Sequence, residues 1–149
     1  MGNRKGRYQP KSFESTGTGN DVSANLYRSM IESDAFLDLS ANQQRLYVFC
    51  KLQFYGQKKA ANMEPEQFYF NRGIWQRKYR LYKAGNERAF YRDMGALISH
   101  GFIACVKCGA FSRTKTVYRF SDRWRTYGTE FFVVPNEEKT VSLRRKESQ

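Results

Sequence analysis

The segment from Asn86 to Ile103 has the clearest alternation of apolar and polar positions in the chain. Four of its apolar residues recur at intervals of three and four, the spacing of a single helix face. They are Phe90, Met94, Leu97 and Ile98. The pattern predicts a helix over residues 86–100 that buries this stripe against a core.

Both ends of this helix carry local signals. Asn86 is a residue type that caps helix starts, and Gly101 stands where helices commonly end in a left-handed turn. Glu87 favours the positive end of the helix dipole, although it could also accept a hydrogen bond from cytosine. The face opposite the stripe is assigned Glu87, Arg88, Tyr91, Arg92 and Asp93. A face that only needs solvation requires no arginines or tyrosine, so we expect this one to touch a ligand.

Three further helices and a short strand are predicted before it. Apolar spacing suggests a first helix from Asp21 towards Phe36, and Ser40 with Gln43 forms a capping box that starts a second helix ending near Gly56. Residues 68–70 are a strand candidate. A third helix, capped by Asn71, covers residues 74–82 and is followed by a tight turn at residues 83–85.

Two β-type runs follow, at residues 102–107 and 115–120, joined by a hairpin loop. The order is helix, helix, strand, helix, turn, helix and hairpin, which predicts an α+β winged helix-turn-helix, mainly helical with a small antiparallel sheet. The strand before the third helix can pair with the hairpin. We expect the domain to span residues 21–127, between a basic disordered arm at 1–20 and a charged C-terminal tail at 128–149.

Charge indicates the kind of partner. The 149 residues carry a net charge of +12, and 40% hydrophobic content is enough for one core. Between Arg72 and Arg125 there are 13 Lys and Arg against three acids. This concentration favours nucleic acid over an anionic membrane. No apolar run approaches the ~20 residues of a membrane span, and the N-terminus lacks the apolar core of a secretory signal, so we expect a cytoplasmic protein.

Specific roles follow from how proteins read DNA. Arg88 and Arg92 are candidates for base contacts, with Tyr91 against the backbone or a thymine methyl. Asn86 could read adenine, but helix capping is the favoured interpretation. Candidates for phosphate contacts lie on the third helix, the turn and the wing tip: Arg77, Lys78, Arg80, Lys83, Arg113, Thr114 and Lys115. The arm, with Arg4, Lys5, Arg7 and Lys11, could enter a minor groove or serve as a solubilising tail.

Other motifs carry less weight. Cys105 and Cys108 form a CxxC near His100, but a structural zinc site needs four closed ligands, so we expect reduced cysteines and no metal or cofactor. Trp75, Tyr79 and Tyr82 could stack on bases, although their helical spacing favours core packing. No nucleophile has an activating neighbour, so we expect no enzyme activity.

From Leu26 to Tyr127 the chain resembles winged-helix DNA-binding proteins of bacterial plasmids and conjugative elements. The residues that carry the resemblance are L-S-x5-L-Y at 39–47, L-I-S-H-G-F-I at 97–103 and V-Y-R-F-S-D-R-W at 117–124. The N-terminal domains of plasmid replication initiators look similar, as do accessory proteins that bind transfer origins. Initiators usually carry a further domain, whereas this chain ends about 22 residues after Tyr127, which favours an accessory or regulatory role.

The sequence therefore predicts a sequence-specific binder of double-stranded DNA in conjugative transfer, plasmid replication or transcriptional control. A homodimer, or a relaxase or replication partner, is compatible with this function, and no membrane partner is expected. The alternative is a protein-interaction module, such as a replisome or relaxosome scaffold, whose basic face meets an acidic partner.

Overall fold

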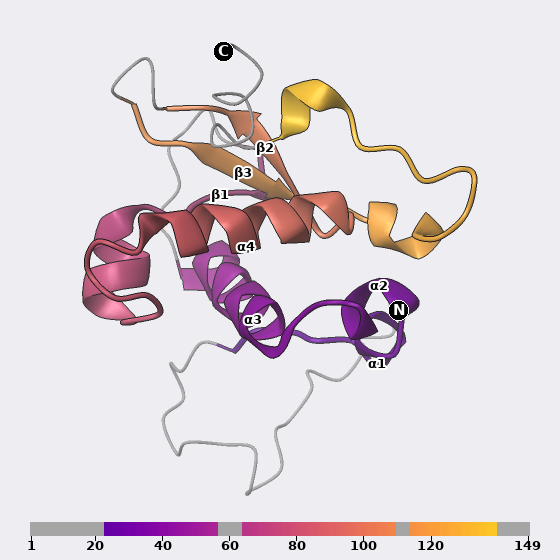
Figure 1. Cartoon of the computed structure of the whole chain (residues 1–149), viewed down its shortest axis with the longest axis horizontal. Coiled ribbons are helices and arrows are strands. Elements are labelled where there is room, and N and C mark those ends of the chain that lie inside the picture. Colours follow the sequence, from indigo (N-terminus) through magenta and orange to yellow (C-terminus); the bar gives the residue numbers. More distant parts are fainter. Residues whose placement is uncertain (1–22, 57–63, 110–113, 140–149) are drawn as a thin grey trace, which may run out of the picture.

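The computed structural model describes residues 23–56, 64–109 and 114–139 (Figure 1). Its elements are α1 (Arg28–Ile31), α2 (Asp34–Leu37), α3 (Ala41–Gly56), β1 (Gln67–Tyr69), η1 (Gly73–Lys78), α4 (Glu87–Ser99), β2 (Ile103–Lys107), β3 (Val117–Phe120), η2 (Arg123–Thr126) and η3 (Asn136–Glu138). The fold (Figure 1) is α+β in a winged-helix-like arrangement, in which α3 and α4 both contact the sheet. No helix among the described residues is long and apolar enough to cross a membrane.

The three strands form one antiparallel sheet in the order β1-β3-β2. Tyr118 at the centre of β3 pairs with Phe68 of β1 and with Cys105 of β2, and all three side chains are buried. The expected pairing of the early strand with the later hairpin is confirmed. One face of the sheet is therefore part of the core.

The capping box at the start of α3 is also confirmed. The backbone N–H of Ser40 donates to Oε1 of Gln43 at 2.9 Å, and the N–H of Gln43 donates to Oγ of Ser40 at 3.3 Å. Leu46, Tyr47 and Cys50 then follow into the core. This start is fixed by residues three apart, which is why the sequence predicts it well.

The four stripe residues of α4 are all buried, as predicted. Phe90 stacks on Trp75 of η1, with ring centroids 4.4 Å apart. Tyr82 contacts Trp75 edge-on at 5.7 Å, and Tyr79 packs against Phe49 at 4.8 Å. The core-packing interpretation of Trp75, Tyr79 and Tyr82 is confirmed.

The predicted first helix is wrong in its extent, because two short helices replace it. Ser33 separates them: its hydroxyl donates to the carbonyl oxygen of Met30 at 2.6 Å and accepts from the N–H of Phe36 at 3.2 Å. A serine that bonds the backbone in this way ends one helix and caps the next. Asp21, the expected start, lies outside the described residues.

The third helix starts as expected but ends early. Asn71 Oδ1 accepts from the N–H of Ile74 at 3.2 Å, which confirms its capping role. The helix stops at Lys78, and Arg80 adopts a left-handed backbone with φ 53°. This reversal turns Leu81 and Tyr82 towards the core, so tertiary packing overrides the helical periodicity.

The two ends of α4 have different outcomes. Gly101 adopts the expected left-handed conformation, with φ 85°. Asn86, in contrast, makes no side-chain capping bond, so its predicted cap is wrong. Its ψ of 45° departs from the extended backbone that lets a cap side chain reach the helix N–H groups.

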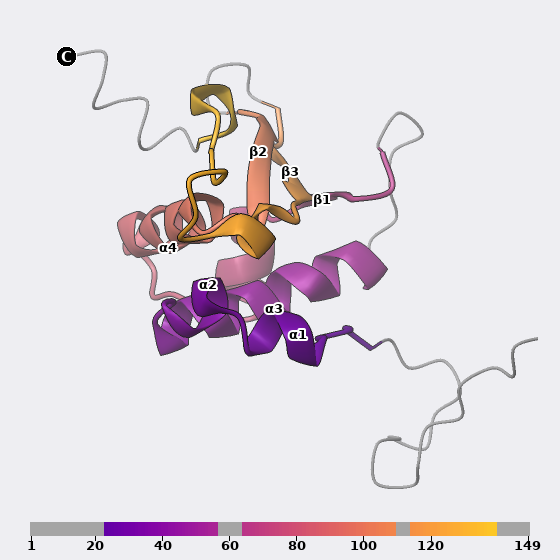
Figure 2. The same ribbon diagram turned by 90° about the vertical axis from the view of Figure 1, so that its right-hand side faces the viewer.

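The chain beyond Tyr127 returns to the body of the molecule as a strap, residues 128–139 (Figure 2). Phe132 packs edge-on against Tyr127 at 5.3 Å, and Val134 packs against the core. The strap ends in η3, beside β2. Packed structure thus continues past the expected boundary at residue 127. The expected arm at 1–20 lies outside the described residues.

Candidate nucleic-acid interface

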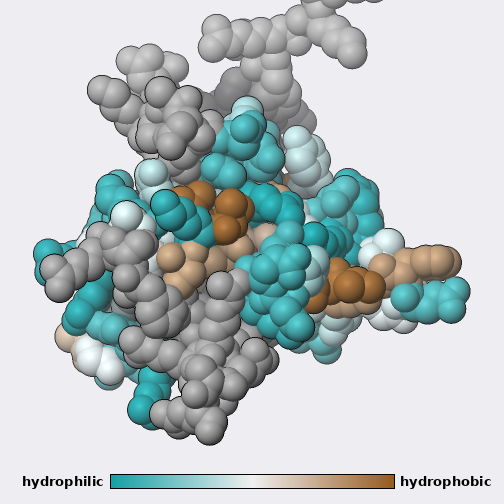
Figure 3. Space-filling model, turned by 90° about the horizontal axis from the view of Figure 1, so that it is seen from above, coloured by the Kyte–Doolittle hydropathy of each residue, from teal (hydrophilic) through white to brown (hydrophobic). Residues whose placement is uncertain are grey.

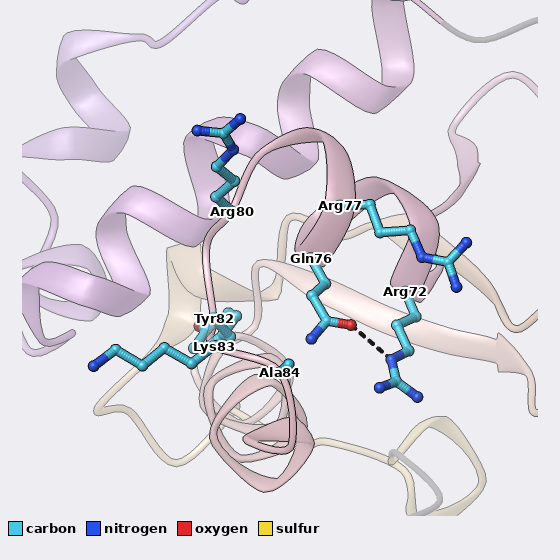
Figure 4. Close-up of a pocket in the computed structure, with 7 residues that line it drawn as sticks. All are labelled: Arg72, Gln76, Arg77, Arg80, Tyr82, Lys83 and Ala84. Carbon is cyan, nitrogen blue, oxygen red and sulfur yellow. Dashed lines mark hydrogen bonds between the residues drawn. The ribbon is translucent and has the colours of Figure 1, made fainter.

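An open hollow of about 530 Å³ is formed by η1, the residue before it and the turn that leads to α4 (Figure 4). Its lining residues are Arg72, Gln76, Arg77, Arg80, Tyr82, Lys83 and Ala84. Three of these were predicted as phosphate contacts, namely Arg77, Arg80 and Lys83. The structure therefore brings together cations from a helix and a turn that the sequence could only place in succession.

The four cationic side chains of the hollow spread outwards instead of meeting at one point. Arg72 and Arg77 extend to one side in Figure 4, while Arg80 and Lys83 extend away from them. Spread cations match charges that are spaced along a chain, as in a nucleic-acid backbone, better than a single small anion.

Arg72 is a residue that the site prediction missed. Its Nε donates to Oε1 of Gln76 at 2.7 Å, and its Nη1 lies 2.6 Å from Oε1 of Glu87. Arg72 thus ties η1 to the first turn of α4 and partly neutralises Glu87. The available signal was the four-residue spacing of Arg72, which directly follows the predicted Asn71 cap, and Gln76 of the predicted helix.

The outer face of α4 presents Arg88, which is exposed, and Arg92, whose side chain is 71% exposed. Tyr91 is partly buried, and its ring contacts Phe90 edge-on at 5.2 Å. Tyr91 therefore leans on the core while the two arginines extend into solvent.

The expected exposure of Asp93 is wrong, since only 2% of its surface is accessible. The Tyr82 hydroxyl donates to Asp93 Oδ2 at 2.7 Å, and Gln43 Nε2 donates to Oδ1 at 3.3 Å. Arg92 Nε lies 3.4 Å from the same oxygen. Asp93 lies three residues after Phe90 on the helix, so it borders the buried stripe, where these partners offset the cost of its burial.

This network also acts on Tyr82. Burial, and then the hydrogen bond to Asp93, raise the pKa of the Tyr82 phenol well above its usual value. Tyr82 therefore keeps its proton and remains a donor. The hydrogen bond thus joins Tyr82, one of the residues that line the hollow, to α4.

The structure describes three of the four remaining residues that were predicted to contact phosphates, on the wing and the third helix. Thr114 and Lys115 are exposed, and Lys115 Nζ lies 5.1 Å from the centre of the Tyr69 ring. Arg113 lies outside the described residues. Lys78 is exposed but is not among the residues that line the hollow; its Nζ lies 5.2 Å from the Tyr79 ring.

All three cysteines lie in the core or pack against it. Cys50 and Cys105 are buried, and burial raises the pKa of the Cys50 thiol. No cluster of three or more His, Cys, Asp or Glu that could hold a metal exists within the described ranges. His100 instead lies 2.9 Å from Asp38 and stacks on Tyr127.

No protein-family model, no curated protein and no solved structure matches this chain. The family resemblance of the sequence therefore stays a prediction.

Proposed function

We propose that this chain is a winged-helix protein that binds double-stranded DNA sequence-specifically and serves a mobile element. Its role would be in conjugative transfer, plasmid replication or transcriptional control. The proposal rests on one observation. The residues that line the cationic hollow come just before α4 in the chain, and the exposed face of α4 carries Arg88 and Arg92. Phosphate contacts and base contacts can thus be made by adjacent parts of one surface.

In this arrangement α4 enters the major groove and the hollow contacts the flanking backbone. Arg88 and Arg92 bond guanine edges, and Asn86, which caps no N–H of α4, is available for adenine. The ion pair with Arg72 partly neutralises Glu87, so the first turn of α4 repels phosphates less.

The test is a duplex selection with random and plasmid-derived fragments, titrated at two salt concentrations. A discrete site that is bound well above random duplex at physiological salt supports the proposal, and the location of that site assigns the role. Uniform binding that disappears with salt would contradict it.

Two variants separate the contact types. Arg88→Ala should relax specificity at one base position by about 1–3 kcal/mol. Lys115→Ala should weaken all sequences alike and lower the salt slope by about one. Arg28→Ala is the matched control, because this arginine lies on α1 with its side chain 87% exposed and should change neither quantity. If Arg88→Ala weakens all sequences equally, base reading by Arg88 is ruled out.

A protein-interaction module is the second candidate, and exposed apolar residues favour it. Phe131 and Val133 of the strap are 75% and 66% exposed. Apolar surface is visible among hydrophilic residues on the sheet side of the molecule (Figure 3). If the chain has this function, Arg88→Ala should leave any DNA binding unchanged but should abolish binding of the acidic protein partner.

A further inference from the structure

Glu138 of η3 bonds two arginines that come from separate elements. Its Oε1 accepts from Nη2 of Arg119 at 2.8 Å and from Nη2 of Arg123 at 3.1 Å. Its Oε2 accepts from Nη1 of Arg123. The three side chains are only 18–28% exposed. Both carboxylate oxygens are therefore engaged in a partly enclosed site.

The chemistry of this site is that of an oxyanion receptor. The planar fork of arginine binds carboxylate and phosphate oxygens with the same two-bond geometry. Hydrogen bonding to Arg123 lowers the pKa of Glu138, and Glu138 in turn raises the pKa of Arg123. The chain's own carboxylate thus occupies a place that a phosphate group could take.

The strap that carries Glu138 is exposed over its first part, residues 128–131. It leaves the body at Gly128, which has φ 80° and open space where a side chain would lie. It bulges away from the body before it returns over the sheet (Figures 1 and 2). Phe131 and Val133 are largely exposed, whereas Phe132 packs against Tyr127, Val134 packs against the core and Glu138 bonds the two arginines. Release of such a segment opens little apolar surface.

The two arginines lie near the far end of α4 from the hollow. The N–H of Trp124 in η2 donates to the carbonyl oxygen of Gly101, just after α4, at 3.1 Å. The 13 residues of α4 span about 20 Å. An anionic chain that reaches both sites would gain charge contacts in addition to those at the hollow.

We propose that Arg119 and Arg123 form a second binding site for backbone phosphates of nucleic acid, and that Glu138 on the strap holds this site closed. The proposal rests on the proposed function in assuming that the polyanion is DNA. Autoinhibition of this kind restrains sequence-independent binding, because the strap competes with any phosphate for the same two guanidinium groups.

The experiment compares Glu138→Gln with Glu130→Gln in the full chain, using random-sequence duplex over a salt series. Glu130 is an exposed acid on the same strap, so its variant loses the same charge without touching the arginines. Two added phosphate contacts should steepen the slope of log affinity against log salt by about 2 in Glu138→Gln. Affinity at low salt should rise at least tenfold. Glu130→Gln should match the wild type in slope.

The Arg123→Gln variant tests whether the added salt slope comes from the arginine pair. In the wild type it should not lower the slope, because Arg123 is already occupied by Glu138. In the Glu138→Gln background it should remove about half of the added slope. Val134→Ala is a second route to release, since it loosens the strap without changing any charge, and it should also steepen the slope.

The proposal is overturned if Glu138→Gln and Glu130→Gln give the same slope, or if Arg123→Gln weakens both backgrounds equally. If Glu138→Gln gains affinity for poly-glutamate but not for duplex, the nucleic-acid assignment is wrong. These outcomes are separate from the proposed function, which fails if the wild type shows no preference among duplex sequences. The random-duplex comparison is valid in either case.

Discussion

The hydrogen bond between Tyr82 and Asp93 joins the turn before α4 to the helix itself. Tyr82→Phe removes one oxygen and leaves the ring contacts with Trp75 and Phe90 in place. The carboxylate then loses its shortest hydrogen bond, at 2.7 Å, while it stays buried. The substitution therefore isolates a single polar contact in the wall of the hollow.

A hydrogen bond to a charged group contributes about 1.5–3 kcal/mol to the free energy of unfolding. Tyr82 is partly buried, so water can replace only part of what is lost. For a chain of this size each kcal/mol moves Tm by about 3–4 °C, so Tm should fall by roughly 5–12 °C. The effect on stability should thus be large for the loss of one atom.

The assay is urea unfolding followed by circular dichroism, with the slope m checked for constancy. Tyr27→Phe is the matched control, because Tyr27 is exposed and its substitution should stay within about 0.5 kcal/mol. If Tyr82→Phe also stays within about 0.5 kcal/mol, the buried Asp93 does not anchor the turn, and the account of the hollow's wall is refuted.

Two further predictions concern the backbone and acid stability. Gly101→Ala should cost more than about 3 kcal/mol, because a Cβ there meets Trp124 N at 2.5 Å in a left-handed backbone, whereas Gly128→Ala, with nothing within 4 Å, should cost about 1 kcal/mol. Equal losses of Tm in the two variants would contradict this reasoning. The hydrogen bond to Arg123 lowers the pKa of Glu138 in the folded protein. The stability that ionised Glu138 contributes is therefore complete above pH 4.5, the ordinary pKa of a glutamate, and is lost as pH falls through the lower pKa of the folded state. Glu138→Gln should flatten that part of a pH series of unfolding midpoints, and an unchanged acid limb would exclude the ion pair as its source.

Several features of the fold are written in short stretches of sequence. The Ser40–Gln43 box, the Asn71 cap and the left-handed Gly101 each depend on residues within three or four positions. The apolar stripe of α4 needs only the helical period. Such signals are read reliably because the interacting groups are neighbours in the chain.

The sequence predicts the candidate site only in part, because some of its contacts join residues that are far apart in the chain. Arg77, Arg80 and Lys83 were predicted, since cations just before a basic helix suggest backbone contacts. Arg72 was missed because its partner Glu87 lies 15 positions away, across a turn. The early end of η1 and the reversal at Arg80 were decided by packing against Trp75 and Phe90, not by local propensity.

By itself the sequence determined the order of elements from α3 to β3, the buried face of α4 and the concentration of positive charge. Only the tertiary structure decided which charged groups remain available to bind a partner. Asp93 is buried because Gln43, 50 positions earlier, and Tyr82 converge on it, and Arg119 and Arg123 are occupied because a strap folds back. Periodicity and charge counts are properties of the chain, whereas the partner of a charge is chosen by contacts between residues that are distant in the chain and adjacent in space.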